Sequence, residues 1–288
     1  MLEATEIVWQ NGKIIPREQA NPSIASHSLH LGIGVFDGIM AYWNHGHYYI
    51  HEVNAHLTRF KQNSHNMGLK FSWSQEELEV AIQELLEQLP ARDYYIRPIT
   101  YRSVPQVHVN QSEELPVDVA ILAFMTSRNI SKSLDCHLSN YERVSGVAIP
   151  VAWKVCGTYV NSYLVRRAAQ KAGFNDGIML DHQGRLTEAS AANLFCLTQE
   201  AIITPALTPD IFPGITRLTV LKIAKQLGIE VVEQDVFTED IPKFQGAFLA
   251  STFMELKPLN KIDNFQYNSD KNPIFLKILN EFREITHQ

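Results

Sequence analysis

Cysteine, clustered basic residues and long apolar runs are all scarce in this sequence. Its three cysteines form no CxxC pair, so neither a disulfide framework nor a structural zinc site is predicted. The formal net charge is -6, and lysine and arginine are spread along the chain, which argues against a nucleic-acid or anionic-membrane surface. The histidines lack HExxH spacing, so we expect no metal. Without a signal-peptide pattern or a membrane-length apolar run, we expect a cytoplasmic protein.

The chain does have the composition of a globular protein, with 45% hydrophobic and 19% charged residues. Its 288 residues suit two domains. Strand-like and helix-like segments alternate without a repeated βα unit, which predicts a mixed α/β (α+β) fold. The polar, aperiodic stretch 126–135 predicts a linker between a small N-terminal α/β domain, 1–125, and a larger C-terminal domain, 136–288, that carries Lys154.

Period and capping signals predict individual elements within these domains. An Asn-Gly turn predicts a hairpin over 7–16. The predicted helices lie at about 54–67, 75–88, 161–172, 215–227 and 273–285. The other predicted strands lie at about 47–51, 94–101, 117–124, 229–232 and 247–250, with one more ending at 151–153.

Lys154 is the first candidate for chemistry. It follows an apolar segment, Val147 to Trp153, where an ammonium group loses solvation. Desolvation favours the neutral amine, which can form a Schiff base with an aldehyde. The alternative is a lysine that extends from the end of a strand to water.

Two further segments have the character of ligand sites. Pro213–Arg217 has the pattern of a helix N-terminus with free backbone donors, which suits an anion, although most helix starts bind none. Glu188 lies among small and apolar residues, and if buried it needs a cationic or protonated partner. A pyridinium nitrogen would serve, and the alternative is a solvated carboxylate in a turn.

Short segments in a fixed order then suggest a family. They are 26–32, 35–39, 56–60, 95–98, 154–161, 187–188, 193–195, 213–217, 251–252, Glu255 and Pro258. Together they resemble the fold-type IV pyridoxal 5′-phosphate (PLP) enzymes, which include branched-chain and D-amino-acid aminotransferases and aminodeoxychorismate lyase. The resemblance implies two domains with PLP in the cleft between them, held as a Schiff base on Lys154.

The resemblance also implies how the cofactor is held. Arg59 would bind its phosphate together with the backbone amides of Ile215 and Thr216 and with Thr252, a set of donors suited to a dianion. Tyr159 would contact the phenolic oxygen. Glu188 would pair with the pyridine nitrogen and keep it protonated, so that the ring stays an electron sink.

The expected substrate follows from the branched-chain members of the family. In them, the tyrosine of a Tyr-x-Arg pair, here Tyr95, helps to hold the substrate carboxylate. The arginine, here Arg97, can meet the side-chain carboxylate of glutamate. Phe36 would line an apolar side-chain pocket, and backbone donors near Thr252 and Phe253 would complete carboxylate binding.

We therefore expect transamination of hydrophobic, branched-chain L-amino acids with 2-oxoglutarate as acceptor. We also expect a homodimer, or an oligomer built from dimers, in which the loop near Leu31 and Val109 reaches a neighbour's pocket. Leu31, Ala191-Ala192 and Phe253-Met254 depart from the branched-chain pattern and leave the preferred amino acid open.

Three other functions remain as alternatives. Tyr95-x-Arg97 argues against the first, an aminodeoxychorismate lyase. The second is a D-amino-acid aminotransferase, but the segment 105–109 lacks the arginine of that group's Arg-x-His pair. The third is a non-catalytic PLP-binding protein, and the presence of Lys154, Tyr159 and Glu188 together argues against it.

Overall fold

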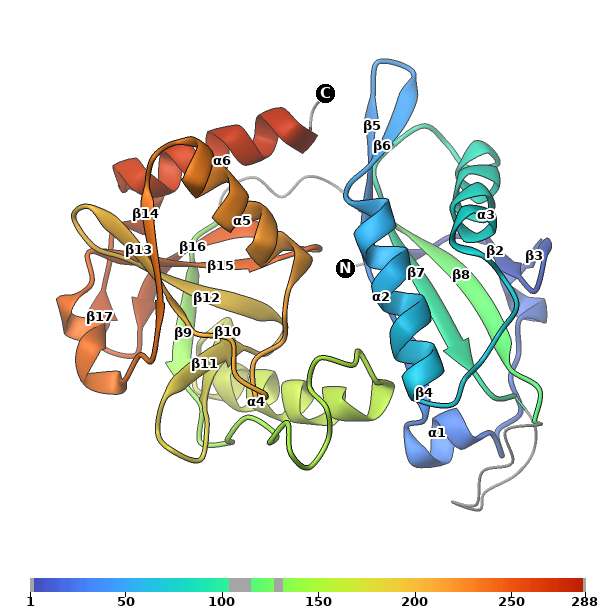
Figure 1. The fold of residues 1–288 in the computed structure, drawn as a ribbon, viewed down its shortest axis with the longest axis horizontal. Helices are drawn as coiled ribbons and strands as arrows, with labels where there is room; N and C mark the ends of the chain where they lie inside the picture. Colours follow the sequence, from blue (N-terminus) through green and yellow to red (C-terminus); the bar gives the residue numbers. More distant parts are fainter. Residues whose placement is uncertain (1–2, 104–114, 127–131, 287–288) are drawn as a thin grey trace. The chain divides into compact units, whose positions relative to one another are not determined.

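The computed structural model of the protein describes residues 3–103, 115–126 and 132–286. These residues divide into two compact units, one drawn from Met1–Arg128 and Trp153–Gly157 and the other from Asn129–Ala152 and Thr158–Thr286 (Figure 1). Val109, the segment 105–109 and the middle of the predicted linker lie outside the described residues. The end of that linker is already strand β9, which begins at Leu134.

The first unit is built on an antiparallel sheet of eight strands. Six follow the path β3-β2-β8-β7-β5-β6, while β1 pairs with β8 and β4 pairs with β7. The strands are β1 (Glu3–Ala4), β2 (Ile7–Gln10), β3 (Lys13–Pro16), β4 (Gly34–Phe36), β5 (Ile39–Asn44), β6 (His47–Ile50), β7 (Tyr94–Tyr101) and β8 (Asp118–Met125).

Helices α2 (Val53–Asn66) and α3 (Gln75–Glu87) lie over one face of this sheet (Figure 1). A short helix, α1 (His27–Leu31), precedes β4. The side chains of β7 alternate between the two faces, as strand geometry requires. Tyr94 and Ile96 pack in the core beneath the helices, so Tyr95 and Arg97 point to the other face.

Lys154 belongs to the first unit by its contacts, although we expected it in the C-terminal domain. Val155 forms an isolated antiparallel bridge with Val35, and the Phe36 amide donates to the Lys154 carbonyl at 3.1 Å. The predicted strand ending at 151–153 was wrong, because those residues form turns and Pro150 before them has no N–H for a ladder. Val147 is 90% exposed whereas Val151 is 3% exposed, so the apolar segment before the lysine is not uniformly buried.

In the second unit, nine strands form a sheet that closes on itself. The path β11-β10-β9-β16-β15-β12 becomes a ring because β11 also pairs with β12, while β13 and β14 extend it beyond β12 and β17 pairs with β16. The strands are β9 (Leu134–Leu138), β10 (Asp176–Leu180), β11 (Leu186–Ala189), β12 (Ala192–Leu197), β13 (Ala201–Pro205), β14 (Glu230–Gln234), β15 (Gly246–Ser251), β16 (Glu255–Ile262) and β17 (Phe265–Gln266).

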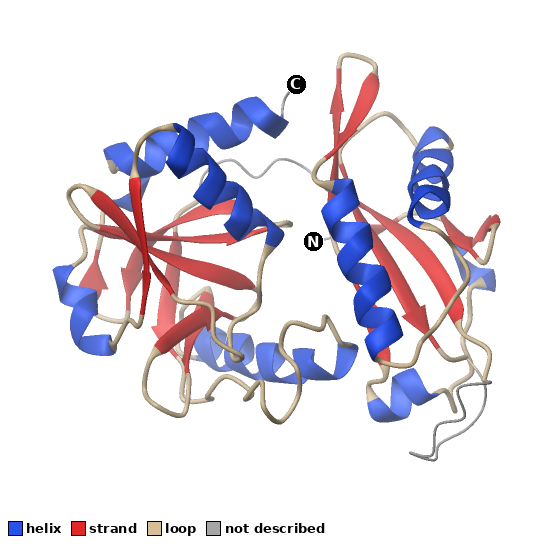
Figure 2. Ribbon diagram, in the orientation of Figure 1, coloured by secondary structure: helices blue, strands red, loops and turns tan. Residues whose placement is uncertain are grey.

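Three helices pack on this sheet (Figure 2): α4 (Tyr159–Lys171), α5 (Ile215–Gln226) and α6 (Pro273–Thr286). Alternate residues of β12 serve two cores. Leu194 and Cys196 pack with the other ring strands, whereas Phe195 and Leu197 pack beneath α5 and α6. Because of this alternation, Asn193 faces the same side of β12 as Phe195 and Leu197.

Most of the predicted local elements are confirmed. The hairpin turns at Asn11 and Gly12, both with positive φ, as a two-residue turn of this kind requires. The five longest helices begin and end within two residues of their predicted positions. Ser74 and Glu77 form a capping box at the start of α3. None of the helices in the described residues is long and apolar enough to span a membrane.

Candidate active site

The predicted substrate residue Arg97 and the predicted Schiff-base lysine both lie over the ring of Phe36, a second predicted substrate residue, in the first unit. The Arg97 guanidinium carbon lies 4.6 Å from the centroid of the Phe36 ring, and Lys154 Nζ lies 5.3 Å from the same centroid. Arg97 also donates to the Tyr95 hydroxyl at 3.1 Å. Its buried Nε has no hydrogen-bond partner among the described residues, so this N–H can still donate to a carboxylate.

The Tyr95 hydroxyl is positioned by a glycine. A Cβ atom placed on Gly38 would lie 2.0 Å from that oxygen, well inside contact distance. The absence of a side chain at Gly38 therefore lets the hydroxyl sit against the backbone next to Phe36 and Asp37.

Arg59, the predicted phosphate ligand, is held by a buried network. Its Nε and Nη2 atoms donate to the two carboxylate oxygens of Asp37, at 2.8 and 2.7 Å. His56 Nδ1 lies 2.8 Å from Asp37 Oδ1, and both residues are fully buried. Burial alone would raise the pKa of Asp37, but the Arg59 guanidinium and His56 hold it below its usual range. Asp37 and His56 lie within the family motifs, but we predicted no role for them from the sequence. The spacing of His56 and Arg59, which are neighbours on one helix face, could have indicated that they act together.

His56 should make stability depend on pH. Burial lowers the pKa of His56, opposed by Asp37, and the charges of Arg59 and Lys154 lower it further. Below about pH 6.5 the unfolded chain binds a proton at this histidine more readily than the folded chain does. We therefore expect the free energy of unfolding to decrease as the pH falls from about 7.5 to about 5.5, measured from urea midpoints. In His56→Gln this decrease should be smaller. His47→Gln, at an exposed site, should show the same decrease as the wild type. An equal decrease in His56→Gln and the wild type would contradict the assignment of the pH dependence to His56.

Glu188, in the second unit, is a buried carboxylate and not a solvated turn residue. It lies within β11 and is 4% exposed. Arg143 Nη2 lies 2.8 Å from Oε1, and Asn193 Nδ2 donates to Oε2 at 3.0 Å. A carboxylate accepts hydrogen bonds from N–H groups, so the buried Glu188 suits an N–H donor such as that of a pyridinium.

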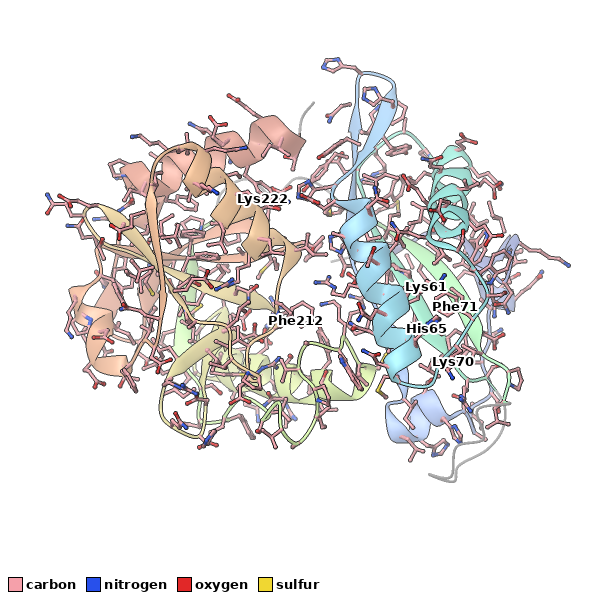
Figure 3. The ribbon with its side chains drawn as sticks, viewed as in Figure 1. Lys61, His65, Lys70, Phe71, Phe212 and Lys222 are labelled. Carbon is pink, nitrogen blue, oxygen red and sulfur yellow. The ribbon has the colours of Figure 1, made fainter. Side chains whose placement is uncertain are left out.

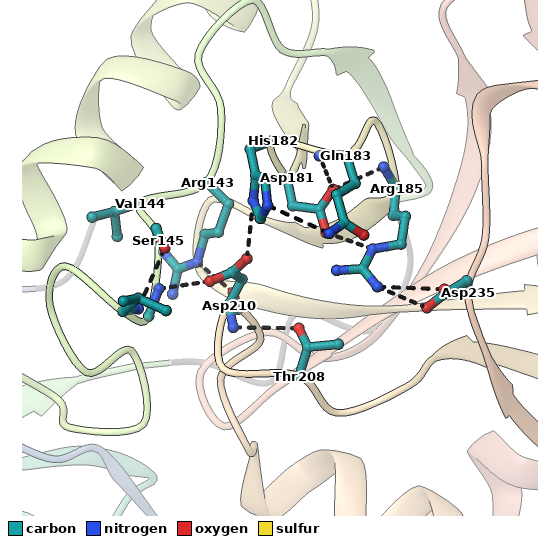
Figure 4. Close-up of polar contacts among 12 residues, drawn as sticks. Arg143, Val144, Ser145, Asp181, His182, Gln183, Arg185, Thr208, Asp210 and Asp235 are labelled. Atoms are coloured by element: carbon teal, nitrogen blue, oxygen red, sulfur yellow. Dashed lines mark hydrogen bonds and ion pairs between the residues drawn. The ribbon is translucent and has the colours of Figure 1, made fainter.

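We did not predict a role for Arg143 from the sequence. Its side chain is held by a hydrogen bond to the loop around Asp210. Its Nε donates to the Asp210 carbonyl at 3.2 Å, and the Gly146 amide donates to Asp210 Oδ1 at 2.6 Å (Figure 4). The charge on Glu188 is thus compensated by an arginine that the loop around Asp210 orients. No local pattern points to Arg143, because its partners are distant in sequence.

The remaining predicted cofactor and substrate residues of the second unit lie at element ends. Ile215 and Thr216 are the first residues of α5, where backbone N–H groups have no acceptor within the helix. Thr252 and Phe253 form the turn between β15 and β16, and Phe253 is 45% exposed. Tyr159 is the half-buried first residue of α4.

These residues fit PLP by their chemistry. The Arg59 guanidinium and the α5 N-terminus, which carries a partial positive charge, suit a phosphate. Glu188, a buried carboxylate with a cationic neighbour, suits the N–H of a protonated pyridine. Lys154 supplies an amine beside an aromatic ring. Each part of the cofactor thus has a matching group in the chain.

Comparison with known proteins gives one consistent result. Residues 34–262 match the family model described as amino-transferase class IV. Over 283 residues the chain is 30% identical to the branched-chain-amino-acid aminotransferase of Salmonella typhimurium, covering 96% of this chain and 92% of that protein.

Solved structures agree. The branched-chain aminotransferase of the archaeon Thermoproteus uzoniensis, crystallised with norvaline, superposes with a TM-score of 0.93 at 32% identity, covering 99% of this chain and 95% of that one. The branched-chain amino acid aminotransferase of Thermobaculum terrenum, crystallised in its PLP form, gives a TM-score of 0.90 at 26% identity, with coverage of 99% and 94%. The predicted fold class, a fold-type IV arrangement of mixed α and β structure, is confirmed.

Proposed function

The chain belongs to the class IV aminotransferases, and we propose that it transfers the amino group of branched-chain L-amino acids to 2-oxoglutarate with PLP as its cofactor. The observation that carries the substrate class is the cluster of Phe36, Tyr95, Arg97 and Lys154. It combines an apolar ring for a hydrocarbon side chain, polar donors for a carboxylate and an amine for the reaction centre.

We assign cofactor binding to residues of both units. Arg59, the Ile215 and Thr216 amides and Thr252 would bind the phosphate. Tyr159 would contact the phenolic oxygen, and Glu188 would accept the pyridine N–H. When bound, PLP supplies an aldehyde that bonds to amines and a protonated ring that withdraws electrons from the substrate Cα.

The chain's own residues then have distinct tasks. Lys154 would hold the cofactor through its amine, and its Nζ, when free, would remove the proton from the substrate Cα. Arg97 and Tyr95 orient the substrate carboxylate groups, and backbone donors at Thr252 and Phe253 assist them. Phe36 excludes water from the space that the hydrocarbon side chain fills. Glu188 would favour the protonated form of the ring nitrogen.

We further propose that the protein is a cytoplasmic homodimer, or an oligomer built from such dimers. The support is the exposure of apolar side chains near α1, including Leu29 at 68% and Leu31 at 37%. A partner subunit would cover them. We likewise propose two domains, at 1–125 and 136–288, joined by 126–135, with the segment around Lys154 packing on the first domain and the last two linker residues already in β9.

One panel experiment tests the function. The purified protein is mixed with L-leucine, L-isoleucine, L-valine, their D-enantiomers or D-alanine together with 2-oxoglutarate, and glutamate formation is measured. In a separate assay, the protein is mixed with aminodeoxychorismate and pyruvate release is measured. We expect turnover of the L-amino acids alone. Turnover confined to the D-amino acids, or pyruvate release from aminodeoxychorismate, would replace the proposed function by one of its alternatives. A protein that binds PLP but shows no change in absorbance with any amino acid would be a non-catalytic binder.

A further inference from the structure

We infer that Asn193 is a positioning residue. Its side-chain amide connects the two cofactor-binding parts of the second unit, the Glu188 carboxylate and the N-terminus of α5. The inference rests on the proposed function, because it assumes that both parts hold PLP. Asn193 would explain structurally why the two parts keep a fixed spacing.

A tight hairpin brings Asn193 to the Glu188 carboxylate. Strands β11 and β12 pair with Glu188 opposite Asn193 and Ala189 opposite Ala192, so only Ser190 and Ala191 form the turn. Directly opposed residues of an antiparallel pair project to the same face with their Cβ atoms about 5 Å apart. This register brings Asn193 Nδ2 to 3.0 Å from Glu188 Oε2.

The same side-chain amide of Asn193 also binds the loop before α5. Asn193 Nδ2 also donates to the Phe212 carbonyl at 2.9 Å, and that carbonyl accepts the Gly214 amide at 2.9 Å as well. Phe212 lies in the segment that leads into α5 (Figure 3). A side-chain amide has two N–H bonds, so one can serve the carboxylate and the other the loop. Because Asn193 is 5% exposed, bulk water cannot easily replace either bond.

Gly214 shows how closely the loop approaches this amide. Its φ of -68° and ψ of 137° suit any L-residue, so backbone conformation does not require glycine here. A Cβ atom at Gly214 would instead lie 2.2 Å from Asn193 Oδ1. The residue that caps the α5 N-terminus therefore packs directly on the side chain that holds Glu188.

The consequence for binding is geometric. The ring nitrogen and the phosphate of PLP are joined by a nearly rigid framework, so their protein partners must also keep a fixed separation. A displacement of about 1 Å in a positioned group can cost roughly 100-fold in rate. A single buried amide bonded to both partners is a direct means of keeping that separation.

The test uses Asn193→Ala, Gly214→Ala and the double variant, with Asn260→Ala as a matched control. Asn260 also donates its amide to a carboxylate, that of Asp135 at 3.0 Å, but at the surface of β16. Each full-length, cofactor-free chain is titrated with PLP and with pyridoxal, which lacks the phosphate. The ratio of the two Kd values reports how well the phosphate is bound, a quantity that lower global stability alone would not change.

We expect both single variants to weaken PLP binding by roughly 10- to 100-fold, the range for a lost hydrogen bond to a charged group, and to bring the two Kd values closer together. The double variant should bind PLP no more weakly than Asn193→Ala, because the methyl group that Gly214→Ala adds then has room where the amide was. Asn260→Ala should match the wild type in both Kd values.

Two results would overturn the inference while leaving the proposed function intact: a wild-type ratio of Kd values in Asn193→Ala, or additive losses in the double variant. If Asn193→Ala did not fold, Gly214→Ala would provide the test, since unchanged PLP binding in that variant also refutes the positioning role of Asn193. A wild-type chain that bound no PLP at all would refute the proposed function and the inference together.

Discussion

Lys154→Ala should abolish measurable turnover, with kcat reduced by roughly 10⁴-fold or more, the upper range for removal of a positioned acid–base group. The loss should be this large because the same Nζ atom both bonds the cofactor and moves the Cα proton. Lys154→Arg should be equally inactive, since a guanidinium stays protonated and keeps the charge without supplying a free amine. The measurement is steady-state glutamate formation from L-leucine and 2-oxoglutarate.

A second lysine provides the control for this prediction. Burial lowers the pKa of Lys257, which is 8% exposed in β16 and is therefore the strongest rival amine. Lys257→Met should retain turnover, and after borohydride reduction of the PLP-bound protein, peptide mass spectrometry should find the label on Lys154. A label on Lys257, or activity in Lys154→Ala, would refute the assignment.

Glu188→Gln should lower kcat by about 10² to 10³-fold, comparable to the loss of one preorganised electrostatic group in an active site. A neutral amide cannot hold the ring nitrogen in its protonated form, so the ring becomes a weaker electron sink. The protein should still bind PLP, because the phosphate donors and Lys154 remain. The absorbance spectrum of the bound cofactor should change, which separates loss of ring protonation from loss of cofactor.

Glu188→Asp is the matched variant. It keeps the charge that compensates Arg143 and should recover part of the activity, limited by its shorter side chain. Equal activity of the glutamine variant and the wild type would show that Glu188 only neutralises Arg143. A glutamine variant that no longer bound PLP would instead assign Glu188 to cofactor retention.

Much of the local structure could be predicted from the sequence, because its signals act between neighbouring residues. The capping box of Ser74 and Glu77 forms within one helical turn, and the hairpin at Asn11 and Gly12 needs only their backbone preferences. The ordered motifs also indicated the family, and the comparisons confirmed it. The one failed strand, at 151–153, came from hydrophobicity without period, a signal that does not distinguish a buried strand from an exposed turn.

Only the tertiary structure decided which groups surround the reactive ones. Lys154 lies beside Phe36 because the segment around Val155 bridges to β4, a contact between residues far apart in the sequence. Arg143 neutralises Glu188, and Asn193 joins that carboxylate to the loop before α5. The sequence by itself determined the family, the local elements and the residue types of the site. Their charges and spacings depend on long-range packing, which no local pattern encodes.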